Sequence, residues 1–178
     1  MSDNKKSADK FKLDLAKIFG SVVPGKVIAM HQEIAVDGLR RLIAKSPVGN
    51  PSIWQSNLDS SGNRRSKRSK KIRKPKGYVG GQFRGNWQMS IGSFDTAEVA
   101  GIRSPSATMS AGESVAKRLK DFGVSHLQNN LPYAQRLEEG HSGQAPMGMI
   151  ALTFGEMNIF AGQLASLYST EQIKDGGS

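Results

Sequence analysis

The sequence predicts an α+β fold in which long N-terminal and C-terminal helices pack on a small antiparallel sheet, with a long basic loop inserted between the first helix and the sheet. Two long stretches carry helical periodicity, and a period-2 alternation of apolar and polar residues lies between them. The length of 178 residues fits one compact domain. We expect that domain to span residues 11–170, between flexible termini at 1–10 and 171–178.

The first long helix is predicted from Gly25 to Lys45. At about 100° per residue, one side of this helix is apolar and consists of Val27, Ile28, Ala35, Leu39, Leu42 and Ile43. The opposite side is polar and consists of Lys26, Glu33, Asp37, Arg40 and Arg41, of which Asp37 and Arg41 form an i,i+4 pair. Pro47 predicts the end of the helix, because the residue before a proline is disfavoured in the α region.

The next segment, 48–81, is predicted to be a loop, because Gly, Pro, Ser, Asn and basic residues dominate it. A connection of this length inside a compact domain is usually functional or disordered. Trp87, Met89 and Ile91 then alternate with polar residues, which predicts a half-buried strand. A second, weaker strand is predicted from Glu98 to Ile102.

The second half of the chain predicts a helix, a strand and the long C-terminal helix. Ser110 and Glu113 resemble a capping box for a helix at 111–122 that Gly123 ends. A strand follows at 124–129, and Pro132 with Tyr133 turns it into a short helix. From Met147 onward we expect the last helix, whose packing seam steps by four and three residues through Ile150, Phe154, Met157, Ala161, Leu164 and Tyr168.

Composition excludes several classes of protein. The chain has no cysteine, so it has neither disulfides nor thiolate metal ligands. No apolar run reaches the roughly 20 residues that a membrane-spanning helix needs, and the first ten residues lack the apolar core of a secretory signal. We therefore expect a soluble protein made in the cytoplasm, with no membrane partner.

The net charge of +10 is concentrated in one segment of 13 residues. This basic segment contains no acid and nine cations, namely Arg64, Arg65, Lys67, Arg68, Lys70, Lys71, Arg73, Lys74 and Lys76. Removing these nine charges leaves the rest of the chain at +1. Such a run can be a solvated, self-repelling loop, or it can bind phosphates without reading bases. We favour contact with phosphates or with an acidic partner, because the charge exceeds what solubility requires.

Candidate chemistry is sparse. Glu138, Glu139 and His141 gather acids and a possible metal ligand, but a hydrolytic zinc site usually needs three protein ligands, and His31 and His126 are distant in sequence. A polar turn or a subunit contact explains the cluster better. His31 lies at the edge of an apolar helix face, which favours a hydrogen-bonded boundary histidine. The chain has no nucleophile elbow and no nucleotide-binding glycine motif, so we expect no enzyme, cofactor or metal.

Three motifs together resemble one family. The stretch Asn129–Thr153, NNLPYAQRLEEGHSGQAPMGMIALT, resembles the signature of tail-completion or neck proteins of long-tailed bacteriophages. Arg84–Gly92, RGNWQMSIG, is similar to the strand motif that precedes it, and Ser46–Gly49, SPVG, to the Ser/Thr-Pro-Val that ends the first helix. The matches occur in the family's order. Residues that carry them are Arg84, Asn86, Trp87, Asn130, Pro132, Tyr133, Glu138, Gly140, His141, Pro146 and Gly148.

The resemblance implies a structural virion protein without catalysis. Such a protein forms a homo-oligomeric ring, a hexamer or a dodecamer, that surrounds the path of the genomic DNA at the head–tail interface. Its neighbours are a portal, adaptor or stopper ring on one side and tail terminator or tail tube proteins on the other. Two departures from the family pattern are the longer insertion that begins at Gly49 and Glu139 in place of an aromatic residue.

A second hypothesis is a cytoplasmic nucleic-acid-binding protein whose basic segment coats phosphates without sequence preference. It predicts DNA binding by the isolated chain that weakens steeply with salt. An enzyme that uses Glu138, Glu139 and His141 is a third hypothesis.

Overall fold

A computed structural model describes residues 24–53, 58, 60–61, 76 and 80–175. The first 23 residues and most of the basic segment lie outside these residues. The elements, in chain order, are α2 (Pro24–Lys45), the 3₁₀ turn η1 (Pro51–Ile53), α3 (Gln82–Gly85), β1 (Trp87–Ile91), α4 (Pro105–Ala116), β2 (Ser125–Asn129), α5 (Ala134–Glu138) and α6 (Ile150–Asp175). The predicted α+β class is confirmed.

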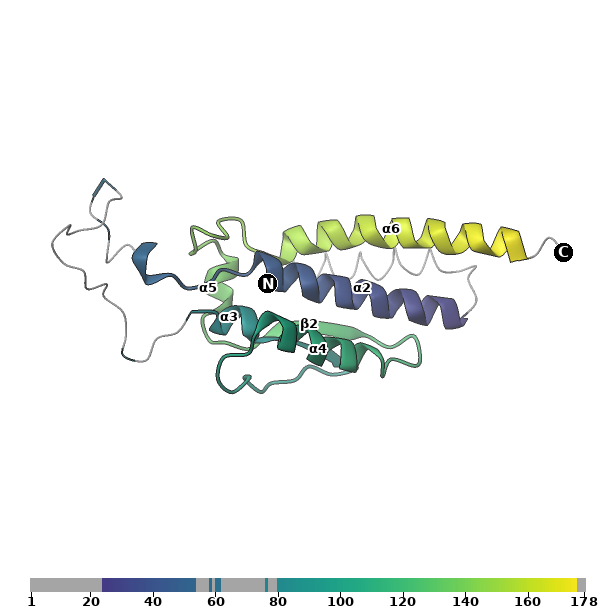
Figure 1. Ribbon diagram of the computed structural model, residues 1–178, viewed down its shortest axis with the longest axis horizontal. Coiled ribbons are helices and arrows are strands. Elements are labelled where there is room, and N and C mark those ends of the chain that lie inside the picture. The colour runs from purple at the N-terminus through teal and green to yellow at the C-terminus, as the bar shows by residue number, and fades with distance from the viewer. Residues whose placement is uncertain (1–23, 54–57, 59, 62–75, 77–79, 176–178) are drawn as a thin grey trace.

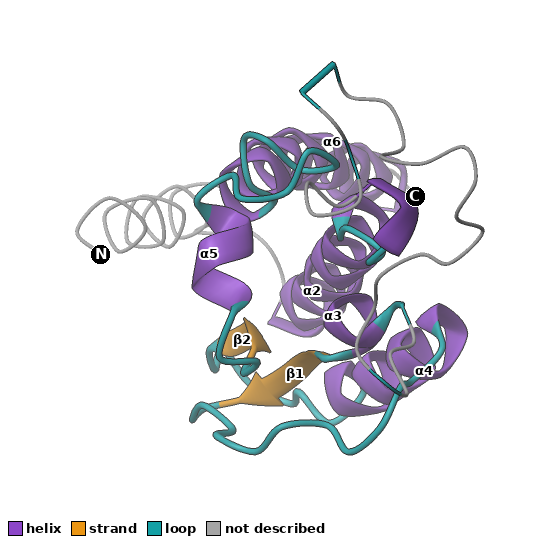
Figure 2. Ribbon diagram, turned by 90° about the vertical axis from the view of Figure 1, so that its left-hand side faces the viewer, coloured by secondary structure: helices purple, strands orange, loops and turns teal. Residues whose placement is uncertain are grey.

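Helix α2 forms the middle layer of the molecule. Helix α6 lies along one side of α2, and α4 with the two-stranded sheet lies along the other (Figure 1; an end view is in Figure 2). The C-terminal helix thus packs on α2 more than on the sheet. Because α2 has neighbours on two sides, its apolar surface is wider than one stripe and also includes Met30 and Ile34, which are fully buried.

The core has two clusters of buried side chains, one on each side of α2. Between α2 and α6 lie Met30, Ile34, Met157, Ala161 and Leu164. This cluster confirms the predicted seam of α6, with Phe154 and Tyr168 packed at its margin. The second cluster joins α2 to the sheet, α4 and the start of α6, and includes Leu39, Leu42, Phe83, Trp87, Met89, Leu131 and Met149. No helix in the described part of the chain is both long and apolar enough to cross a membrane.

Strands β1 and β2 pair antiparallel and confirm the two stronger strand predictions. Their register runs from Trp87 opposite Asn129 to Ile91 opposite Ser125. The N–H of Gly92 donates to the carbonyl of Val124 at 2.8 Å and continues the ladder by one pair. The short helix predicted after Pro132 is also present, as α5.

The strand predicted from Glu98 to Ile102 is wrong. Residues 93–99, which we call the strap, pass beside the sheet without joining its ladder. The side-chain amide of Asn86 donates to the carbonyl of Val99 and accepts from its N–H, both at 3.2 Å, and Gln88 donates to the carbonyl of Ala97 at 2.7 Å. Side-chain amides therefore take the hydrogen bonds that a neighbouring strand would have made.

The helix predicted at 111–122 is real but misplaced, because α4 runs from Pro105 to Ala116. The Ser104 side chain accepts from the N–H of Ala107 at 3.2 Å, and Pro105 takes the first helical position, so this pair is the true N-terminal signal. Beyond Ala116 the chain turns, which leaves Leu119 buried but Phe122 exposed. Helix α6 similarly begins at Ile150 rather than Met147, and it ends inside the segment expected to be a flexible C-terminus.

We predict opposite effects of alanine at two helical glycines. A Cβ at Gly112 of α4 would lie 2.1 Å from Cδ2 of Leu39, whereas a Cβ at Gly162 of α6 would meet nothing within 4 Å. Overpacking should lower the free energy of unfolding of Gly112→Ala by about 1–3 kcal/mol. Gly162→Ala should raise it by up to about 1 kcal/mol through helix propensity. Urea unfolding measures both, and equal effects would contradict the close packing of α4 on α2.

Candidate functional site

The basic segment falls largely outside the described residues. Arg64, Arg65, Lys67, Arg68, Lys70, Lys71, Arg73 and Lys74 are not described, and Lys76, which is, is exposed. The two ends of the insertion are nevertheless placed. A Cβ at Gly80 would lie 2.5 Å from the carbonyl oxygen of Gly49, so the chain leaves and re-enters the domain at neighbouring points. Contact of the basic segment with DNA or an acidic partner stays a prediction.

The first two family-like motifs meet at the end of α2. Ser46 is buried, and its hydroxyl donates to the carbonyl of Leu42 at 2.6 Å while it accepts from the indole N–H of Trp87 at 2.7 Å. Arg84 donates from Nη2 to the carbonyl of Ser46 at 3.1 Å. The chain turn after α2 is therefore held by two side chains about 40 residues further on, which lie around the start of β1.

The third motif joins the same place. The side-chain amide of Gln144 donates to the carbonyl of Val48 at 2.8 Å and accepts from its N–H at 3.0 Å. The ring of Phe83 packs on Trp87 and Tyr133, with centroid distances of 5.8 and 6.2 Å. We call this meeting of segments 46–48, 83–87 and 129–148 the motif junction.

Within the third motif, Glu138 caps helix α6. Its carboxylate accepts from the backbone N–H groups of Met149 at 2.8 Å and Ile150 at 2.9 Å. A negative charge at a helix N-terminus is favourable, because unpaired N–H groups and the helix dipole both point toward it. Gly148 has φ +73°, and a Cβ there would lie 2.4 Å from the carbonyl oxygen of Glu138, so a glycine is required beside the cap.

The turn between α5 and α6 explains two further motif residues. Gly140 has φ +85°, and a Cβ there would lie 2.4 Å from the carbonyl oxygen of Pro146. The backbone of this turn therefore comes too close for any side chain at position 140. Pro132 is exposed at the turn between β2 and α5, where Tyr133 is the N-terminal cap residue of α5.

The acidic cluster that could have supported an enzyme is engaged in local structure. Glu139 accepts from the side-chain amide of Gln135 at 2.8 Å, and Nδ1 of His141 lies 3.0 Å from the carbonyl oxygen of Arg136. Glu138 caps α6, as described above. Across the described ranges, no three His, Asp or Glu side chains gather as metal ligands would. The contacts favour the polar-turn interpretation of the cluster.

Asn86 and Asn130 hold the strap. Asn86 is fully buried against Val99, and Asn130 donates to the carbonyls of Asp95 at 2.9 Å and Ala97 at 2.8 Å. On the paired strands, Gln88 stands opposite Gln128, which also donates to the carbonyl of Asp95. A layer of amides on one face of the sheet thus binds alternate carbonyls of an extended chain.

His31 confirms the predicted boundary histidine. It is partly buried on α2, and its Nε2 lies 3.0 Å from the hydroxyl oxygen of Ser125 at the start of β2. Burial lowers the pKa of the imidazole, because the charged form loses solvation there. His126 lies elsewhere, with its ring against Phe94 at 4.1 Å between centroids.

Ion pairs tie α2 to α6. Arg41 donates to Asp37 on its own helix and, from Nη1, to Glu156 of α6 at 2.7 Å, while Lys45 donates to the same carboxylate at 2.6 Å. Asp37, expected on the polar face of its helix, is in fact buried beneath Arg40 and Arg41. The hydrogen bonds from Lys45 and Arg41 lower the pKa of Glu156, and those to Asp37 and Glu156 raise the pKa of Arg41.

The side of α6 turned away from α2 is exposed and uncharged. Between residues 150 and 170 the helix carries one charged side chain, Glu156, and that one is paired with α2. Ile159 and Leu167 are each more than 60% exposed. We define the outer face of α6 as Leu152, Gly155, Ile159, Gln163, Ser166 and Leu167. Large apolar side chains exposed on an uncharged helix face can form a contact surface.

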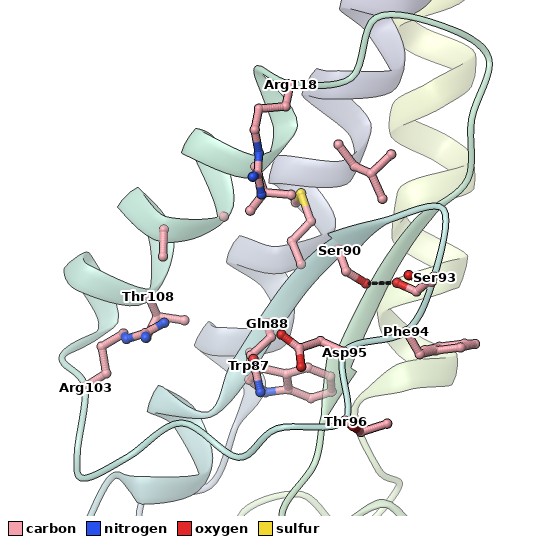
Figure 3. Close-up of a pocket in the computed structure, with 15 residues that line it drawn as sticks. Trp87, Gln88, Ser90, Ser93, Phe94, Asp95, Thr96, Arg103, Thr108 and Arg118 are labelled. Atoms are coloured by element: carbon pink, nitrogen blue, oxygen red, sulfur yellow. Dashed lines mark hydrogen bonds between the residues drawn. The ribbon is translucent and has the colours of Figure 1, made fainter.

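A groove lies between β1 and α4 (Figure 3). Its volume is about 730 Å³, and strand β1 lines it over its whole length. Thr108, Ala111, Gly112 and Val115 of α4 form the opposite wall. Two arginines, Arg103 and Arg118, and one acid, Asp95, also line it. The sequence did not predict this groove. Arg118 fell inside the helix predicted at 111–122, and Arg103 fell between that helix and the strand predicted at 98–102. Nothing therefore indicated that the two arginines line one groove.

Comparison with protein-family models, with curated proteins and with solved structures finds no match to this chain. The resemblance to phage neck proteins therefore rests on the motifs and stays a prediction.

We predict that Glu138→Ala destabilises the protein by about 1–2 kcal/mol, because two N–H groups at the start of α6 lose their acceptor. Glu138→Gln should cost less, since its carbonyl oxygen still accepts. Glu139→Ala is the matched control, because Glu139 is exposed and its side chain accepts from Gln135, four residues earlier. This variant should change stability by less than about 0.5 kcal/mol. Equal losses for the two alanine variants in urea unfolding would contradict the capping role.

We also predict that His31 makes stability depend on pH. The folded protein holds the imidazole in its neutral form, so below the ordinary pKa of 6.5 the unfolded chain binds a proton more readily. The free energy of unfolding should fall as pH drops through that region, by less than about 1.4 kcal/mol per pH unit, the limit for one proton. His31→Gln should remove this component. Parallel curves for the two proteins between pH 7.5 and 5 would contradict the prediction.

Proposed function

We propose that this chain is a structural protein of the phage neck, one subunit of a homo-oligomeric ring that joins head to tail around the DNA path, without catalytic activity. The observation that carries the proposal is the motif junction. Three short motifs that resemble one family, up to 96 positions apart in the chain, hydrogen-bond and pack together at one end of α2. Their contact supports treating the three motifs as parts of one structural unit.

The roles of the motif residues support a structural function. Glu138, Gly140 and Gly148 fix the start of α6, while Ser46, Arg84 and Trp87 fix the end of α2. Each of these residues contacts a segment distant from it or fixes a tight turn, which is the role of a residue that holds the fold together. The motif therefore specifies a scaffold.

The outer face of α6 is the surface we assign to self-association. Each copy carries a net charge of +10, so two copies repel wherever their basic groups approach. The outer face of α6 is uncharged and exposes Leu152, Ile159 and Leu167. Two copies can therefore approach there without bringing basic groups together, and apolar burial is available. In a ring this face contacts a different surface of the next subunit.

We predict that Ile159→Lys disrupts the ring. The purified wild-type chain should form a closed oligomer by light scattering and electron microscopy, and the variant should shift toward monomer because a buried unpaired charge is costly. Phe122→Lys is the matched control, since Phe122 is equally exposed but lies after α4 on the other side of the molecule. Monomeric wild-type protein, or oligomers unaffected by Ile159→Lys, would contradict the assignment of this face.

Location is tested in the virus. Virions labelled on this chain should carry the label at the head–tail interface, and deletion of its gene should leave separate heads and tails. Normal joining without the protein would exclude the neck role.

The basic segment distinguishes the nucleic-acid-binding hypothesis. Because Gly49 and Gly80 lie side by side, a short glycine-serine linker can replace residues 51–79 without stretching the chain. The alternative predicts that the isolated wild-type chain binds DNA tightly with steep salt dependence and that the shortened chain does not. If both results are found, and heads and tails also join normally in the absence of the protein, the alternative replaces the neck proposal.

A further inference from the structure

The outward edge of β1 has no strand beside it in the described part of the chain. In an antiparallel pair, hydrogen-bonded and non-hydrogen-bonded positions alternate. Gly92 hydrogen-bonds to Val124, so the residues one, three and five positions earlier, Ile91, Met89 and Trp87, direct their backbone N–H and C=O groups away from β2. The two-stranded sheet provides no partner for these groups.

This free edge faces the groove. Strand β1 forms one wall along its whole length, and the opposite wall on α4 includes the small residue Ala111. Five strand residues span about 17 Å, and the twelve residues of α4 about 18 Å, so the two walls have matching lengths. A volume of about 730 Å³ accommodates an extended segment of several residues.

Positive charge lies at both ends of the groove. Arg103 lies toward the Trp87 end and Arg118 toward the Ser90 end (Figure 3). The ion pairs of the described residues involve neither arginine. The acid that lines the groove, Asp95, accepts from the N–H of Ala97 at 2.9 Å within the strap. The charges therefore suit a ligand with carboxylates near both ends.

We propose that the groove binds an extended, acidic segment of a partner protein, which adds to β1 as a third strand. Backbone groups of Trp87, Met89 and Ile91 hydrogen-bond to the segment, and Arg103 and Arg118 bind its carboxylates. A different, acidic protein is the favoured occupant because this chain carries a net charge of +10. The proposal is independent of the neck assignment.

The test uses the full-length chain and a fluorescent heptapeptide, acetyl-Glu-Thr-Val-Thr-Val-Thr-Glu-amide, in which both glutamates lie on the same side when extended. Fluorescence anisotropy measures its Kd, and amide hydrogen exchange by NMR follows the N–H groups of Trp87, Met89 and Ile91. Saturating peptide should slow exchange at Met89 at least tenfold. Two further peptides carry backbone N-methyl groups, one at the odd-numbered residues and the other at the even-numbered residues. Only one of the two should bind, because alternate N–H groups of the added strand face β1.

Protein variants test the charges and the groove separately. Arg103→Glu with Arg118→Glu should raise the Kd at least tenfold, whereas Arg136→Glu, an exposed arginine on α5, should leave it within twofold. Ala111→Trp fills the groove and should abolish binding, whereas Ser114→Trp, exposed on the same helix outside the groove, should not. Thermal unfolding establishes that each variant folds.

Several outcomes would overturn the proposal. These are no binding of the acidic peptide, equal binding of a peptide with lysine in place of glutamate, equal binding of the two N-methylated peptides, and a Kd unchanged by charge reversal. Protection of Met89 that rises with protein concentration without peptide would show that a second copy of the chain occupies the groove instead.

Discussion

The burial of α2 on two sides is the constraint on which the rest of the molecule depends. A helix with one solvated face needs one apolar stripe, but α2 packs α6 on one side and α4 with the sheet on the other. Close approach on both sides requires glycine. A Cβ at Gly38 would lie within 3 Å of Met157 of α6 and Leu127 of β2, and one at Gly112 of α4 would overlap Leu39. The residual polar side of α2 is narrow, and it carries the ion pairs to Glu156.

Polar contacts then fix how the layers connect at the end of α2. Packing alone leaves the direction of the chain after Lys45 undetermined, whereas the hydroxyl of Ser46 can satisfy Leu42 and Trp87 at once in one arrangement. Glu138 does the same for α6, since its carboxylate must reach two N–H groups at the helix start. Because such bonds are directional and partly buried, a lost partner costs more than the bond contributes. The motif residues therefore act mainly by fixing the path of the chain after α2 and before α6.

Local sequence signals predicted the elements whose periodicity is strong. Burial on one side of an element produces a regular spacing of apolar residues, and that spacing can be found in the sequence without any other information. Examples are the alternation of Trp87, Met89 and Ile91 and the seam from Ile150 to Tyr168. Prediction was wrong where two local signals competed. Ser110 with Glu113 resembles a capping box, yet Ser104 with Pro105 begins the helix, because Thr108 and Gly112 must face the core. Residues 98–102, which overlap the end of the strap, were predicted to be a strand. Asn86 makes the hydrogen bonds to Val99 that a neighbouring strand would have made, and the local composition does not distinguish the two cases.

The site contacts lay beyond the reach of a single sequence for a different reason. Gln144 pairs with Val48 and Arg84 with Ser46 only after α2, the sheet and α6 have assembled, and nothing local marks these side chains as partners. Which edge of β1 remains without a neighbouring strand likewise depends on the edge along which β2 pairs. The basic segment was the most conspicuous feature of the sequence. The insertion that contains it leaves and re-enters the domain at neighbouring points, Gly49 and Gly80, which no local pattern in the sequence indicated.

The placement of the surfaces bears on how one chain could serve in an assembly. The outer face of α6 and the groove beside β1 lie on opposite sides of α2, and the insertion leaves the domain at the end where the motif junction lies (Figure 1). The uncharged helical face, the arginine-flanked strand edge and the basic segment differ in chemistry, so each would suit a different kind of partner. Because the two surfaces lie on opposite sides of α2, a partner bound in the groove would not overlap a neighbour bound at the outer face of α6. Helix α2, which packs against α6 on one side and against α4 and the sheet on the other, lies between the two surfaces and would set the angle between those contacts.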